Sequence, residues 1–216
     1  MALIIKTIAE AVSEAVKELE EKDSIREELI KGTRDADRLI RRSISLIHLG
    51  KYKEAKESLD KAHDILKTLR NKASRFPDLV YGGLLSMSFQ EYVEALSLLT
   101  ILREGRVPSY KEVDVPPAPY LSGLADVIGE LRRRIIDLIR EERLEEADRL
   151  FEIMEGLYLV LREISYPEAL VPGLRRKCDT ARHLVEATRA GLVEAQLKLR
   201  LLKELRKASG ERQRRG

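Results

Sequence analysis

The chain has 216 residues, of which 44% are hydrophobic and 36% charged, with one cysteine and no tryptophan. This length suits one large domain or two small ones, and the composition is typical of long helices with charged surfaces. The single Cys178 excludes an intramolecular disulfide and a cysteine-based zinc site. The formal net charge of +3 does not by itself indicate a nucleic-acid partner.

The sequence carries no expected membrane or secretion signal. No run approaches the ~18 apolar residues that a transmembrane helix requires. The first apolar residues are too few for a signal peptide and continue into a charged helical pattern. We therefore expect a cytoplasmic protein with no membrane partner. Few thermolabile residues beside many Glu, Lys and Arg is a pattern seen in hyperthermophile proteins.

Residues 3 to 49 are expected to be helical throughout, because apolar residues recur at helical spacing. These positions are Ile5, Ile8, Val12, Val16, Leu19, Ile25, Leu29, Leu39, Ile40, Ile44 and Ile47. Asp23 and Ser24, with Glu27 as a capping-box partner, offer an alternative start for a second helix in this stretch.

Three arginines, Arg34, Arg38 and Arg41, share one face of this first helical stretch. Two interpretations remain open from the pattern. The first is a solvated face on which the arginines pair with nearby acids, and the second is a ridge that contacts phosphate groups.

A second helix is expected from Lys51 to about Ser74, between Gly50 and the break at Phe76–Pro77. Its inward residues are Ala55, Leu59, Ala62, Leu66 and Leu69. The segments 50–55 and 142–147 each resemble a tetratricopeptide turn. They lie about 92 residues apart, whereas that repeat requires 34, so a repeat architecture is not favoured.

The helical run from Pro77 to Gly105 carries a stripe in which acids interrupt apolar residues. The stripe consists of Leu84, Met87, Glu91, Glu94, Leu98 and Ile101. A stripe with this spacing normally faces a core or a partner helix. Because an unpaired carboxylate is costly to bury, Glu91 and Glu94 each require a cation, a metal ion or a proton.

Residues 106 to 118 are expected to form a stiff, non-helical linker, because this segment contains Pro108, Pro116 and Pro117. Pro119 or Tyr120 then begins a helix that ends near Arg140. Its core face consists of Leu121, Leu124, Ile128, Leu131, Ile135 and Leu138. Asp126 and Glu130 lie off that face at spacing i, i+4, so their carboxylates point the same way.

Two further helices are expected, from Glu142 to Ile164 and from Leu174 to about Ala208. The inward residues of the last helix are Leu184, Thr188, Leu192, Leu199 and Leu202. The basic cluster Arg175, Arg176 and Lys177 lies in its first turn. Residues 210–216 are expected to be a basic, disordered tail after a single domain that spans 1–209.

No segment alternates with period two, and the sequence has no glycine-rich phosphate loop and no metal-spaced histidines. His48, His63 and His183 are scattered and are interpreted as surface or capping residues. The predicted fold is an all-α, single-domain bundle of six to seven helices.

The two acid pairs lie on consecutive helices joined by a stiff linker, so Glu91, Glu94, Asp126 and Glu130 can converge. Clusters of oxygen ligands alone suit Mg²⁺, with Mn²⁺ as a substitute. Such an ion positions a phosphate and generates hydroxide. The adjacent Arg132, Arg133 and Arg134 would then hold a polyanion or stabilise its transition state.

Two alternatives to a catalytic metal remain. Asp126 with Arg133, or Glu130 with Arg134, would form ion pairs without any metal. A di-iron carboxylate centre usually needs Glu-x-x-His pairs, and no histidine occurs at such a position.

Several segments resemble the translin–trax family, most closely its trax branch. The two acid motifs, Phe89–Ala95 and Tyr120–Arg132, carry the specific part of this resemblance. Arg34–His48 is similar to the family's first long helix, and Leu174–Cys178 to the basic start of its last helix. The resemblance covers roughly Arg34 to Leu192, and the thermophile-like composition would suit an archaeal member.

The resemblance implies a seven-helix subunit that assembles into a closed, hollow oligomer, usually an octamer, which encloses single-stranded or short duplex RNA. In the trax branch it implies a Mg²⁺-dependent endoribonuclease whose acids match Glu91, Glu94, Asp126 and Glu130. In the translin branch the acids are not all kept, and that subunit mainly binds RNA or DNA. Acids at all four positions favour the catalytic branch.

One departure bears on RNA contacts. Translin's early basic segments have no close counterpart, since Ser97–Arg103 contains one basic residue. We therefore expect phosphate contacts from other basic residues and take a homo-oligomer as the simplest assembly. The candidate contacts are Arg133, Arg134, Arg175, Arg176, Lys177, Arg34, Arg38 and Arg41.

Overall fold

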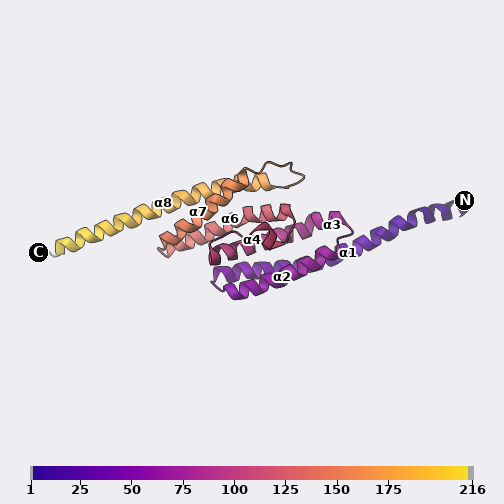
Figure 1. Ribbon diagram of the computed structural model, residues 1–216, viewed down its shortest axis with the longest axis horizontal. Helices are drawn as coiled ribbons and strands as arrows, with labels where there is room; N and C mark the ends of the chain where they lie inside the picture. The colour runs from indigo at the N-terminus through magenta and orange to yellow at the C-terminus, as the bar shows by residue number, and fades with distance from the viewer. Residues whose placement is uncertain (1, 214–216) are drawn as a thin grey trace. The chain divides into compact units, whose positions relative to one another are not determined.

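The structure, a computed structural model, describes residues 2–213, and all regular secondary structure in this part of the chain is α-helical (Figure 1). The helices are α1 (Ala2–His48), α2 (Tyr52–Lys72), α3 (Pro77–Tyr81), α4 (Gly83–Glu104), α5 (Tyr110–Val113), α6 (Pro117–Arg140), α7 (Leu144–Arg162) and α8 (Leu174–Gln213). The predicted all-α class is confirmed. Six of these helices are long, and the very short α3 and α5 raise the number above the predicted six to seven.

The described chain divides into two compact units. The first runs up to Leu99 and includes Pro108–Tyr120, and the second consists of Thr100–Val107 and the chain from Leu121 onward. The single domain expected over residues 1–209 stays a prediction. No helix in the part of the chain that the structure describes is long and apolar enough to cross a membrane.

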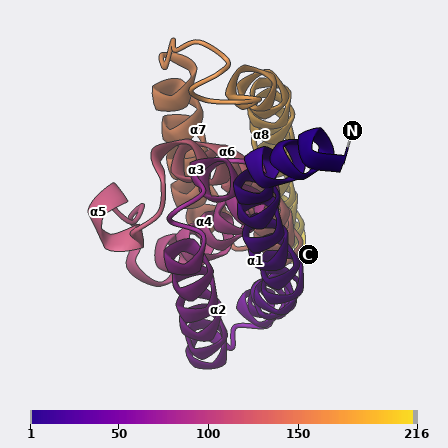
Figure 2. The same cartoon turned by 90° about the vertical axis from the view of Figure 1, so that its right-hand side faces the viewer.

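In the first unit, α1 and α2 lie side by side (Figure 2). All five residues predicted to face inward on α2 are buried. Gly32 lets the helices approach closely, because a Cβ added there would lie 2.8 Å from Cδ1 and Cδ2 of Leu69. The stretch from Ala2 to His48 is one helix, so the alternative helix start at Asp23–Ser24 is not used.

The predicted single helix from Pro77 to Gly105 is wrong, because the chain breaks between α3 and α4. Gly82 is extended, with φ −112° and ψ 167°, and Gly83 adopts φ +56°, a conformation that favours glycine. The two adjacent glycines thus turn the chain where the apolar pattern alone continued. On α4, Phe89 and Val93 are fully buried.

The predicted linker contains a helical turn that the proline pattern did not indicate. Ser109 and Glu112 form a capping box at the start of α5. The turn is further held by Tyr120, whose hydroxyl donates a 2.9 Å hydrogen bond to the carbonyl oxygen of Pro108. The rings of Tyr110 and Tyr120 pack edge to face at 5.3 Å.

In the second unit, α7 and α8 lie side by side, and Gln196 on α8 donates a 2.7 Å hydrogen bond to Asp148 on α7. The predicted core face of α6 is confirmed, with Leu121 half-buried and the remaining five residues buried. This face fixes the rotation of α6 and therefore the direction of its acids.

The last helix differs from its predicted end. α8 continues to Gln213, although its end was expected near Ala208 and a disordered tail from Gly210. The helix continues because residues 203–213 contain no proline and are rich in strong helix formers, which offset the cost of Gly210. The last three residues of the expected tail lie outside the described residues. Leu202, expected to face inward, is exposed.

Candidate functional site

Glu91 and Glu94 lie half-buried on α4, at the edge of its core face. Their neighbours Tyr92 and Val93 are buried, which holds this part of the helix in place. Arg41 on α1 places its Nε 3.9 Å from Oε2 of Glu91. A guanidinium of the proposed phosphate ridge therefore lies beside one of the candidate acids within the same unit.

The stripe that contains these acids does not face the core along its whole length. Leu84 and Met87 are 48% and 61% exposed, whereas Leu98 and Ile101 are buried. The second half of the stripe therefore faces the core of the chain, whereas the first half is exposed within it. The acids lie where the stripe passes from surface to core, so they keep contact with water.

Asp126 and Glu130 lie half-buried on α6. Both oxygens of the Asp126 carboxylate accept hydrogen bonds from Nζ of Lys177, at 2.5 and 2.7 Å. Arg133 places Nη1 3.9 Å from Glu130. The structure thus pairs Asp126 with Lys177 and Glu130 with Arg133, whereas the pairs considered from the sequence were Asp126 with Arg133 and Glu130 with Arg134. Lys177 had been expected to contact phosphate.

A cavity of about 280 Å³ lies beside the Asp126–Lys177 pair in the second unit. It is lined by both of these residues and by Gly129, Arg176 and Thr180, among others. A cation that enters this cavity would meet the Asp126 carboxylate, and an anion would meet the Lys177 ammonium. The pair gives this cavity both signs of charge.

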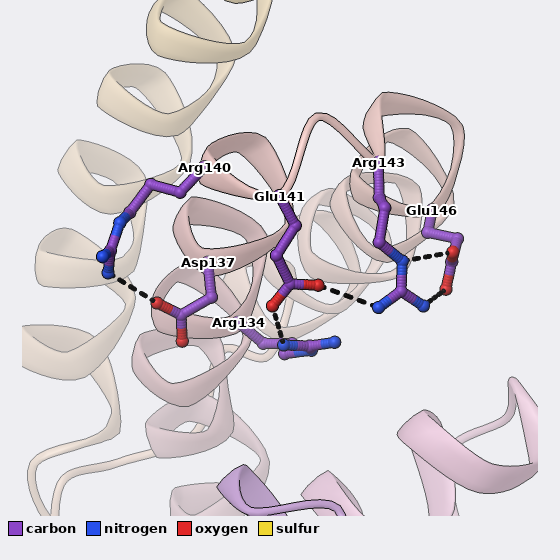
Figure 3. Close-up of polar contacts among 6 residues, drawn as sticks. All are labelled: Arg134, Asp137, Arg140, Glu141, Arg143 and Glu146. Carbon is purple, nitrogen blue, oxygen red and sulfur yellow. Dashed lines mark hydrogen bonds and ion pairs between the residues drawn. The ribbon is translucent and has the colours of Figure 1, made fainter.

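Arg134 takes part in a surface network around the turn between α6 and α7 (Figure 3). Its Nη1 lies 3.3 Å from Glu141, which also binds Arg143, and Arg143 holds Glu146 at 2.6 Å. The Arg143 hydrogen bond, and next the Arg134 charge, lower the pKa of Glu141. These contacts give Arg134 a structural role at this turn.

The remaining predicted basic residues are spread over both units. Arg34 is exposed on α1, and Arg38 pairs with Asp35 at 3.0 Å. Arg175 and Arg176 are exposed in the first turn of α8. The structure therefore supports surface pairing for Arg38 and leaves Arg34, Arg175 and Arg176 exposed to solvent.

One cavity lined by several arginines was not predicted from the sequence. A cavity of about 700 Å³ lies between the end of α7, the segment that follows it and the start of α8. Its lining includes three arginines, two tyrosines and two acids, which are Arg162, Arg175, Arg182, Tyr158, Tyr166, Glu168 and Asp179. Arg175 and Arg182 are seven residues apart on one helix, and this spacing could have indicated from the sequence that they share a face. Arg162 joins them only through the fold.

His63 is half-buried on α2 rather than a surface or capping residue, and its ring stacks on Tyr92 at 4.9 Å. Burial lowers the pKa of His63 below its ordinary value, against a smaller opposing effect of Asp114. Its Nε2 is buried and, among the described residues, has no hydrogen-bond partner. Through this stacking, the imidazole supports the helix turn that carries Glu91.

The carboxylates suit Mg²⁺ in chemistry, because each pair offers only oxygen donors on one helix face. In proteins Mg²⁺ usually keeps several waters and is bound through one or two carboxylates together with substrate phosphates. Within residues 2–213, no group of three or more His, Cys, Asp and Glu side chains lies close enough to hold a metal ion. The convergence of all four acids stays a prediction.

Three kinds of comparison relate this chain to known proteins. A model of the translin family matches residues 24–188. The uncharacterized protein MJ0175 of Methanocaldococcus jannaschii is 39% identical over 191 residues, which are 88% of this chain and 84% of that protein.

Solved structures are similar over the same extent. The AfC3PO–duplex RNA complex matches with a TM-score of 0.80 and 35% identity, over 87% of this chain and 97% of that chain. The crystal structure of apo-NeC3PO matches with a TM-score of 0.71 and 26% identity, over 87% and 96%.

Proposed function

Because the chain belongs to the translin family, we propose that it is an RNA-binding homo-oligomer and a Mg²⁺-dependent endoribonuclease. Its substrate is single-stranded or short duplex RNA, enclosed by the assembled subunits, of which eight is the expected number. The acids at positions 91, 94, 126 and 130 carry the catalytic part of this proposal. Acids at all four positions favour the trax branch in this proposal, and the composition of the chain suits an archaeal source.

RNA binding is supported by one comparison and one feature of the chain. The similar AfC3PO structure was solved with duplex RNA. In this chain, Arg162, Arg175 and Arg182 line one cavity together with Tyr158 and Tyr166. Guanidinium groups bind phosphates through paired hydrogen bonds, and tyrosine rings stack on bases, so this cavity suits a segment of single-stranded RNA.

In the proposed reaction, Glu91, Glu94 and Asp126 would hold Mg²⁺. Glu130 is a further ligand or orients the attacking water. The metal, when bound, polarises the phosphate and lowers the pKa of water. Arg133, which lies one turn from Glu130, would neutralise charge on the phosphate.

Lys177 has a defined part in this proposal. It holds the Asp126 carboxylate in a fixed orientation before RNA arrives, at 2.5 and 2.7 Å. A phosphate that enters the adjacent cavity offers the ammonium a second anion. Lys177 then shares its hydrogen bonds with the phosphate and positions that group beside Asp126.

The test is cleavage of a single-stranded RNA with and without Mg²⁺ by the wild type, Glu91→Ala and Glu57→Ala. Glu57 is an exposed glutamate on α2 and serves as the matched control. Loss of one metal ligand is expected to lower the rate by ~100-fold or more with the fold intact, since it removes charge stabilisation in the transition state. Equal cleavage by wild type and Glu91→Ala would refute the catalytic assignment.

The second candidate function is a non-catalytic RNA- or DNA-binding oligomer of the translin type. The observation that favours it is the Asp126–Lys177 ion pair, which already satisfies one candidate ligand. The same assay separates the two functions. Binding of RNA without any Mg²⁺-dependent cleavage by the wild type would establish the second candidate and exclude the first.

A further inference from the structure

The first part of α1 is amphipathic and exposes its whole apolar face. Its large apolar residues are 47–65% exposed, and they are Ile4, Ile5, Ile8, Val12, Val16 and Leu19. Their spacing of three and four residues makes one continuous stripe, and Ala9, Ala11 and Ala15 extend it on both sides. In both views α1 runs past the end of α2, which leaves this part of the helix without cover from α2 (Figures 1 and 2).

The last part of α8 exposes a second apolar stripe. Val193, Leu197, Leu201 and Leu205 recur every four residues along one side of the helix, Leu202 adds a further apolar side chain, and all five are 48–61% exposed. The opposite side of α8 faces α7, where Thr188 and Leu192 are buried. Within its unit this end of α8 extends beyond α7 (Figure 1).

Two exposed apolar stripes of this length are unusual on a protein surface and mark sites of association. A membrane surface does not suit the α1 stripe, since helices that lie on membranes carry basic polar faces. The polar face of α1 is acidic instead. Residues 4–22 contain five glutamates and three lysines, a net charge of −2.

The polar residues around the α8 stripe carry the opposite net charge. Residues 189–206 contain five basic residues and two glutamates, a net charge of +3. Pairing of two α1 stripes, or of two α8 stripes, brings like charges together, whereas pairing of α1 with α8 brings opposite charges together. Charge complementarity therefore favours the pairing of an α1 stripe with an α8 stripe.

We propose that the α1 stripe of one copy packs against the α8 stripe of a second copy of this chain. The contact joins different surfaces on the two copies. The same contact repeated from copy to copy forms a closed ring if the rotation between neighbouring copies brings the last copy back to the first. Both stripes lie mainly outside residues 24–188, the part that the family model matches. The inference rests on the homo-oligomer in the proposed function and specifies which surfaces form it.

Cysteine cross-linking tests the pairing directly. In a Cys178→Ser background, Val12→Cys and Leu197→Cys chains with different tags are co-expressed and treated with a short bis-maleimide. Because each chain has one cysteine, every product joins two copies. We expect a cross-linked product that contains both tags. A Lys17→Cys chain, with its cysteine on the polar face of α1, should not form this product with the Leu197→Cys chain. Products with one tag only, or none, would overturn the pairing.

Native mass measurement separates this inference from the proposed function. Val12→Glu should reduce the mass of the assembly at least twofold with unchanged helix content, whereas Lys17→Glu should leave it unchanged. A wild type that is monomeric at micromolar concentration would overturn both the inference and the homo-oligomer. A wild-type oligomer whose mass Val12→Glu does not change would overturn the inference alone.

Discussion

The candidate acids of α4 and α6 are half-buried, and the structure gives cationic partners for Glu91, Asp126 and Glu130. Glu91 lies near Arg41, Asp126 binds Lys177, and Glu130 lies near Arg133. The sequence indicated that Glu91 and Glu94 each need a cation, a metal ion or a proton, and Arg41 lies beside the first of them. The sequence could not select Lys177, which is 51 residues from Asp126, because that contact depends on how α8 packs against its unit.

The Asp126–Lys177 pair should stabilise the second unit. Both side chains are about one-quarter exposed, so Lys177→Gln should lower the free energy of unfolding by ~1–2 kcal/mol, between the values for surface and buried pairs. Lys198→Gln, which breaks an exposed pair with Glu194, should change it by less than ~0.5 kcal/mol.

Denaturant unfolding of both variants gives these values. In a double-mutant cycle, Asp126→Asn with Lys177→Gln should cost less than the sum of the single changes. Strict additivity would mean that the two side chains do not interact.

His63 should make stability depend on pH. Its folded-state pKa lies below its ordinary value, because burial disfavours the charged ring. The unfolded chain therefore binds the proton more readily, so this contribution to stability is fully present above about pH 6.5 and is lost as pH falls through the folded pKa. His63→Gln should flatten this part of the profile of unfolding free energy against pH, and an unchanged profile would exclude His63 as its cause.

At the scale of elements, helical periodicity predicted the long helices well, and local backbone chemistry explains the errors. The pattern of Leu85, Phe89 and Val93 carries no sign of the break at Gly82–Gly83, since glycine is tolerated inside a helix. The prolines led us to predict a non-helical linker and to miss α5, although the spacing of Ser109 and Glu112 is that of a capping box. These errors lie away from the acids themselves, so Glu91, Glu94, Asp126 and Glu130 all lie within helices, as expected.

Gly32 should be needed for the close packing of α1 on α2. Gly32→Leu forces extra volume against Leu69 and should lower the unfolding free energy by ~1–3 kcal/mol. Gly191→Ala on α8 is the matched control, because a Cβ there meets no atom within 4 Å. That change should raise stability by up to ~1 kcal/mol through helix propensity, as measured by thermal or denaturant unfolding. A neutral Gly32→Leu would show that α1 and α2 separate easily.

At the scale of the whole molecule, the sequence could not say what covers an apolar face. Ile5, Val12 and Leu19 fit the helical pattern as well as Leu29 and Ile40 do, yet only the latter two are buried within the chain. Periodicity reports that a face is apolar but not whether the same chain or another copy covers it. The same limit applies to the four acids, which the pattern places on helix faces but not near one another.

RNA affinity should depend on salt through the arginines at the start of α8. Replacing Arg175 and Arg176 with glutamine should reduce the slope of log K against log salt concentration by ~0.7 for each phosphate that the protein no longer neutralises, or ~1.4 for both. Lys53→Gln, an exposed change on α2, should leave the slope unchanged. A slope that the double substitution does not alter would remove this part of α8 from the RNA-binding surface.

The central claim is that Glu91, Glu94 and Asp126 bind one metal ion. A crystal of the wild type soaked in Mn²⁺ and measured at the manganese absorption edge tests it most directly. We expect an anomalous peak within ~2.2 Å of carboxylate oxygens from all three residues, with Lys177 no longer holding both oxygens of Asp126. An Asp126 that remains bound to Lys177, with no manganese beside Glu91 and Glu94, would contradict the claim.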